Sequence, residues 1–113
     1  MGQLRIEKIQ ELMKQEISQI ILQELKDPRI DPLLTIVRAD LSGDMSHCKI
    51  YISSFEGKAK AEESAKGLKN AEGFIRRELF HRLKMRKSPA LNFIADDSIA
   101  RSAEINRKLM NLD

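Results

Sequence analysis

Residues 66 to 87 combine many cations with a helical pattern of apolar side chains. The segment carries eight Lys or Arg against two Glu, whereas the rest of the 113-residue chain carries twelve Lys or Arg against fifteen Asp or Glu. Lys and Arg donate charge-assisted hydrogen bonds to phosphate. A basic segment in an otherwise mildly acidic chain is typical of a localised site for a polyanion. We therefore treat this segment as the candidate functional region.

The segment has two faces when it is projected as a helix at about 100° per residue. Its apolar residues form one arc, which predicts a side that packs on a core. Cations and one glycine occupy the opposite face, and further cations extend the charge beyond it. We predict that this surface binds the phosphates of a nucleic acid. The candidate RNA-binding residues on it are Lys66, Lys69, Gly73, Arg76, Arg77, Arg82, Lys84, Arg86 and Lys87.

The apolar pattern is interrupted at Ala71-Glu72-Gly73. In a straight helix Glu72 would lie within the apolar arc, where an unpaired carboxylate is costly to bury. We therefore predict a bend with Gly73 as its pivot, because glycine often marks a bend or a close backbone approach. The start of the second helix would offer backbone amides to a phosphate, so Ala71 and Glu72 are also candidate RNA-binding residues. A packing glycine in a long surface helix is the alternative.

Few other residues have the types and spacing of an active site. Asp96 and Asp97 could hold a metal ion or act as an acid/base pair, although acids just before a helix are more often N-terminal caps. His47, His81 and the single Cys48 lack the spacing of a zinc site, and Cys48 has the surroundings of a half-buried strand. The sequence contains no glycine-rich phosphate loop or nucleophile motif. We predict no catalytic residue, cofactor or metal.

Hydrophobic periodicity predicts an α+β fold that would position the basic surface. The first helix ends at Lys26-Asp27-Pro28, because proline biases the residue before it away from helical geometry. The expected elements are a helix from about Ile6 to Lys26, strands over 35–41 and 48–52 joined by a turn over 42–46, a broken helix from about Lys60 to Ser88, a strand over 90–95, and a last helix from about residue 98.

The sequence leaves several local features of the fold undecided. Val37, Ala39 and Leu41 alternate in the first strand, yet both Ile36 and Val37 could face inward. Arg29 either anchors the loop after the first helix or touches a partner. The last helix has only a weak apolar face, which predicts fraying. Strand order is not defined by the pattern.

Length and hydropathy limit the class of protein. A chain of this size fits one domain over residues 1–113 and can bury a core without disulfides. No apolar run approaches the roughly 20 residues that span a bilayer, and the N-terminus has no signal-peptide pattern. We expect a cytoplasmic protein with no membrane contact.

Two helices joined at a small-residue turn and packed on a three-stranded sheet are the layout of KH RNA-binding domains, although the Gly-x-x-Gly loop of those domains is missing. The motifs instead resemble those of bacterial ribosome-binding factor A, over nearly the whole chain. The N-terminal segment has fewer basic residues than many members show. The motifs that carry the resemblance, in order, are Lys26-Asp27-Pro28-Arg29, Ala71-Glu72-Gly73 with the segment 74–79, Leu83-Lys84-Met85-Arg86, Pro89-Ala90-Leu91-Asn92-Phe93 and Asp96-Asp97-Ser98.

The resemblance implies a KH-like fold of the second type in a factor that is not an enzyme. Members of this family bind the free small (30S) ribosomal subunit, assist late maturation and 5′-end processing of 16S rRNA, and matter most during cold adaptation. The implied partners are therefore the 30S subunit and 16S rRNA, bound by a monomer.

Two alternatives belong to other classes of function. The chain could be a KH-like RNA-binding module with another target, or a protein-interaction module whose isoleucine-rich first helix docks on a partner or forms a dimer. It could also be a small hydrolase or nuclease that uses Asp96 and Asp97.

Overall fold

The computed structural model describes residues 2–99 and 105–106. The elements within these ranges confirm the predicted α+β fold, and most of the predicted last helix lies outside them. Helices and strands follow in the order α1 (Gly2–Gln23), β1 (Thr35–Leu41), β2 (His47–Ser53), α2 (Lys58–Asn70), α3 (Glu72–Leu83) and β3 (Ala90–Asp96).

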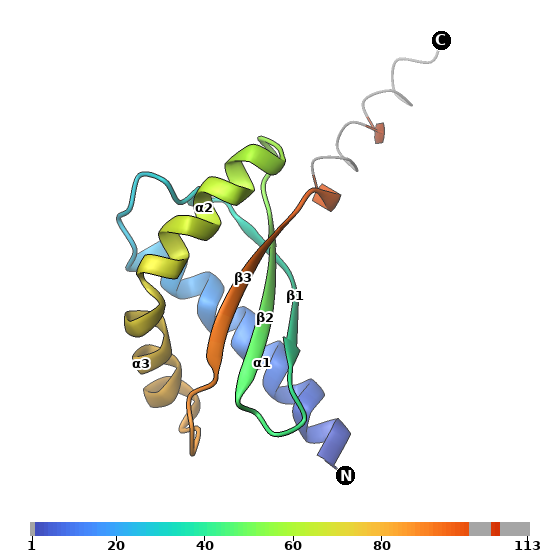
Figure 1. The fold of residues 1–113 in the computed structure, drawn as a ribbon, viewed down its shortest axis with the longest axis vertical. Helices are drawn as coiled ribbons and strands as arrows, with labels where there is room; N and C mark the ends of the chain where they lie inside the picture. The colour runs from blue at the N-terminus through green and yellow to red at the C-terminus, as the bar shows by residue number, and fades with distance from the viewer. Residues whose placement is uncertain (1, 100–104, 107–113) are drawn as a thin grey trace.

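The three strands form one sheet in the order β1-β2-β3, with β2 in the centre (Figure 1). β1 and β2 are the antiparallel hairpin that the alternating pattern predicted. β3 pairs with β2 in parallel, so the chain must cross from one end of the sheet to the other between these strands. α2 and α3 make this crossover, which places the basic segment beside β3.

A β-bulge in β1 explains why both Ile36 and Val37 could face inward. Ile36 pairs with Ile52, but the next residue paired along β1 is Arg38, so Val37 is an extra residue in the strand. Such an insertion shifts the alternation of side chains by one position. Ile36 is buried on the core side and Val37 is half-buried.

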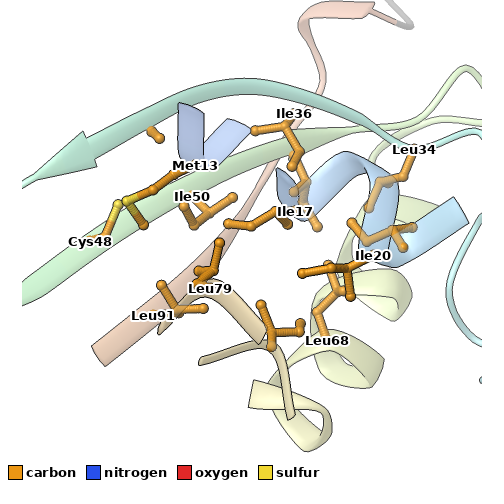
Figure 2. Packing of buried hydrophobic residues seen from close by; sticks show 14 of the residues in the cluster. Met13, Ile17, Ile20, Leu34, Ile36, Cys48, Ile50, Leu68, Leu79 and Leu91 are labelled. Carbon is orange, nitrogen blue, oxygen red and sulfur yellow. The ribbon is translucent and has the colours of Figure 1, made fainter. Parts of the chain in front are cut away.

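The core lies between one face of the sheet and the three helices. Alternate residues Cys48, Ile50 and Ile52 of β2 are buried, whereas His47 and Lys49 between and before them are exposed. Figure 2 shows side chains of α1, β2, α2, α3 and β3 meeting in this core. Cys48 is buried within this core, as the strand pattern predicted, and burial raises the pKa of its thiol to about 12. No helix of the described ranges is long and apolar enough to cross a bilayer.

The loop after α1 is held by side-chain hydrogen bonds and packs closely on α2. Arg29 donates to both carboxylate oxygens of Asp27, at 3.1 and 2.7 Å, and this guanidinium lowers the pKa of Asp27 to about 2. Arg29 therefore anchors the turn. A Cβ on Gly67 would lie 2.7 Å from Cγ1 of Ile30, so only glycine lets α2 approach the loop this closely.

Candidate nucleic-acid interface

The predicted break in the basic helix is present, and it is centred on Ala71. Ala71 has φ −93° and ψ 6°, and it ends α2 and caps the start of α3. Its N–H donates to the carbonyl oxygens of Gly67 and Leu68, while its own carbonyl accepts from Ile75. One residue therefore closes the last turn of α2 and opens the first turn of α3.

Gly73 is not the pivot of this break, contrary to the sequence prediction. It lies inside α3, two residues after Ala71, and its backbone does not have the positive φ that favours glycine. A Cβ at this position would meet no atom within 4 Å. Gly73 is exposed in the first turn of the helix, where backbone amides and the helix dipole favour an anion.

Two shallow hollows flank the break. The first, of about 250 Å³, lies between α2 and β3 and is lined by Lys66 and Lys69 together with strand residues that include Phe93. The second, of about 360 Å³, is lined by α3 and by Ser88 of the following loop. We call the two hollows together the kink site. Its lining residues include Lys66, Lys69, Gly73, Arg77 and Phe80.

The cations of the kink site are available to a ligand. Lys66, Lys69 and Arg77 are at least partly exposed, and none of them forms an ion pair with any other residue that the structure describes. Phe80 adds a ring that is 44% exposed, set edge-on to the neighbouring His81 ring at a centroid distance of 5.6 Å. Exposed rings beside cations are the usual platform for unpaired bases. Phe80 was not among the residues predicted from the sequence, because an aromatic residue at helical spacing is indistinguishable there from a core residue.

Arg76 and Glu72, both predicted to contact RNA, make hydrogen bonds within the fold. One Nη of Arg76 donates to the carbonyl oxygen of Ser88 at 2.9 Å, and the Ser88 hydroxyl donates back to the carbonyl of Arg76. Glu72 accepts the backbone N–H of Leu91 at 2.9 Å. The bond gives the Leu91 N–H, on the outer edge of β3, an acceptor. It also gives the Glu72 carboxylate a hydrogen-bond partner at the break.

Arg82 also differs from the exposed cation that the sequence predicted. Its guanidinium contacts Glu16 at 3.1 Å, Glu24 at 2.5 Å and Glu78 at 3.3 Å. Hydrogen bonding to Glu16, followed by the other carboxylates, raises the pKa of Arg82. The side chain therefore links α3 to α1, and its positive charge is already paired with carboxylates.

Three predicted cations line neither hollow of the kink site: Lys84, Arg86 and Lys87, which follow α3. They line a hollow with Arg5 and Lys8 of α1. These two residues were not predicted from the sequence. Arg5 and Lys8 are three positions apart, which places them on one side of a helix, but periodicity within a helix does not indicate which distant loop it will meet.

Asp96 ends β3, and its Oδ1 accepts the backbone N–H of Ser98 at 2.6 Å. Most of the helix that Asp96 and Asp97 were predicted to cap lies outside the described residues. Among the residues described, no three His, Cys, Asp or Glu side chains are grouped so that they could hold a metal ion.

Comparison with known proteins decides the family. Residues 5–109 match the family model described as ribosome-binding factor A. The chain belongs to the ribosome-binding factor A family. It is 44% identical over 107 residues to ribosome-binding factor A of Acetivibrio thermocellus, covering 95% of this chain and 86% of that protein. It is 40% identical over 113 residues to the Treponema pallidum (strain Nichols) protein of the same description, covering 99% and 90%.

Solved structures of the family share the fold. The crystal structure of ribosome-binding factor A from Thermus thermophilus superposes with a TM-score of 0.69 at 30% identity, covering 80% of this chain and 94% of that one. A homology model of the Thermus thermophilus protein, fitted into a cryo-EM map of a 30S complex with the factor, has a TM-score of 0.62 at 30% identity and covers 75% and 88%.

Proposed function

We propose that this protein is a ribosome assembly factor that binds the free 30S subunit through 16S rRNA and acts in the cytoplasm as a monomer. It assists late maturation and 5′-end processing of the rRNA, and its contribution is greatest in the cold. The observation that carries the proposal is membership of a family in which a relative has been placed in a 30S complex.

The kink site supplies the chemistry that such binding needs. Lys66, Lys69 and Arg77 neutralise phosphates, the exposed amides near Gly73 donate to a phosphate oxygen, and Phe80 stacks on an unpaired base. These groups bind RNA without cleaving it. Binding alone then favours one conformation of an immature rRNA region over its competitors, by the difference in affinity between them. Misfolded RNA helices open more slowly in the cold, so a factor of this kind matters more there.

Burial of the isoleucines of α1 argues against the alternative in which this helix docks on a protein partner or forms a dimer. The isoleucines that suggested a partner-binding helix include Ile17 and Ile20, whose side chains are fully buried in the core of the protein. Leu12 and Leu22 of the same helix are exposed, which is common for single apolar residues on a surface. Light scattering tests the monomeric state directly, because a monomer keeps the same molar mass as the protein concentration increases.

Sedimentation in a sucrose gradient at low magnesium tests the proposal. The tagged protein in lysate is expected to migrate with free 30S subunits and not with 70S ribosomes. Lys66→Ala combined with Lys69→Ala removes two unpaired cations of the kink site and is expected to weaken co-migration, because each charge-assisted contact to phosphate contributes about 1.5–3 kcal/mol.

The matched control is Lys26→Ala combined with Lys49→Ala, which removes the same charge at exposed positions outside the kink site. The control is expected to migrate like the wild type. If both variants lost co-migration with the 30S subunit equally, binding would depend on the overall positive charge of the protein and not on the kink site. Wild-type protein found away from all ribosomal fractions would contradict the proposed function itself.

A further inference from the structure

Three segments that are distant in the sequence enclose a hollow of about 510 Å³ at one end of the molecule. They are the first turns of α1, the turn between β1 and β2, and the loop between α3 and β3, which lie together at the lower end of Figure 1. The break between α2 and α3 lies farther up, beside β3. We call this feature the basic hollow.

Its rim is strongly positive. Asp44 is the only acidic residue among those that line the basic hollow. Its carboxylate accepts hydrogen bonds from the hydroxyls of Ser42 and Ser46. None of the rim cations is within ion-pair distance of a carboxylate of the described residues. The rim therefore attracts a polyanion. Its cations are Arg5, Lys8, Lys84, Arg86 and Lys87.

The floor of the basic hollow is apolar and contains two thioethers. It is formed by Ile9, Leu12, Met45, Leu83 and Met85. Double-stranded RNA would touch only the rim, because its phosphates and sugars face outward and its bases are stacked inside. An unpaired base would cover the floor with its flat ring, and methionine sulfur makes favourable contacts with aromatic rings.

The basic hollow and the kink site have no lining residue in common. Arg82 of α3 lines neither of them, because its guanidinium is paired with Glu16, Glu24 and Glu78.

We propose that the basic hollow binds an unpaired nucleotide of single-stranded RNA, with phosphates on the rim cations and the base on the methionine-lined floor. This inference rests on the proposed function and adds a second RNA segment to it. The protein would then hold one segment at the kink site and another at the basic hollow, and so fix the distance between them.

Binding of fluorescein-labelled octa-adenylate, measured by fluorescence anisotropy, tests the rim. In a Lys66→Ala/Lys69→Ala background, in which the kink site no longer competes for the probe, Lys8→Ala combined with Arg86→Ala is expected to weaken binding about tenfold or more. It is also expected to lower the steepness of log K against log salt by about 1.4, since each phosphate contact to a single strand contributes about 0.7. Thermal melting followed by circular dichroism checks that the variant is folded.

Met45→Gly tests the floor and separates a base from a phosphate ligand. Met45 has a φ of 61°, a left-handed conformation that glycine adopts readily, so the turn is expected to keep its shape. The variant is expected to bind octa-adenylate about two- to tenfold more weakly and to bind a blunt-ended RNA duplex like the wild type. Equal effects on both RNAs, or none on octa-adenylate, would overturn the proposal.

A third probe tests whether the basic hollow binds a protein instead of RNA. It is a synthetic amphipathic peptide of alternating Leu and Glu pairs. Loss of peptide binding in Lys8→Ala/Arg86→Ala with unchanged octa-adenylate binding would assign the basic hollow to a protein and overturn the proposal. Failure of the proposed function looks different, because wild-type protein would then miss the 30S fractions whatever the octa-adenylate result. Intact 30S co-migration with unchanged octa-adenylate binding would overturn this inference alone.

Discussion

Gly67 and Gly73 have opposite surroundings, although both lie in the basic segment. Added methyl groups would therefore have opposite effects. At Gly67 the new Cβ would lie 2.7 Å from an Ile30 carbon and 3.2 Å from a carboxylate oxygen of Asp27, whereas at Gly73 it would enter open space. Gly73 was predicted to be the pivot because it follows the break in the pattern. The packing glycine is Gly67, which the pattern did not distinguish.

We expect Gly73→Ala to raise the free energy of unfolding by about 0.5–1 kcal/mol, because alanine favours the helix and meets no neighbour. Gly67→Ala is expected to lower it by about 1–2 kcal/mol, since overpacking outweighs the gain in helix propensity. Urea denaturation of both variants measures the two values. A destabilised Gly73→Ala would show that the break needs glycine at 73 after all.

Elements were easier to predict than the contacts between them. Alternation and helical spacing are local properties, so the hairpin strands and β3 were found within one residue of their observed bounds. The broken helix was predicted to reach Ser88, but α3 ends at Leu83. The bulge at Val37 and the parallel pairing of β3 depend on partner strands, which periodicity does not contain. For the same reason Arg82 was predicted to be free, because its partner Glu16 comes from a helix far away in the sequence.

The hydrogen bond from the Leu91 N–H to the Glu72 carboxylate joins β3 to the start of α3. Glu72→Ala would leave the Leu91 N–H on the edge of β3 without its acceptor, and we expect a loss of about 1–2 kcal/mol of unfolding free energy. Glu72→Gln keeps an acceptor oxygen and should lose less. Thermal melts of the two variants separate them, and equal loss would show that the bond contributes little.

The molecule, over the residues that the structure describes, gathers cations available to RNA in two places. The kink site offers three exposed cations and the basic hollow five, and Arg82 adds to neither because carboxylates neutralise it. This division could not be predicted from the sequence, where most of the same cations follow one another along one segment. It matters for function, because two contacts on a rigid body restrict the relative position of two RNA segments.

Salt dependence measures how many of these cations contact phosphate. Three contacts to single-stranded RNA predict a slope of log K against log salt of about −2, and eight predict about −5.6. We expect 30S binding to fall with a slope steeper than about −3, because both sites contribute. Lys8→Ala/Arg86→Ala should make the slope shallower, and Lys26→Ala/Lys49→Ala should leave it unchanged. A slope near zero in the wild type would indicate that the ribosomal contact is made to protein, since apolar contacts release no condensed counterions.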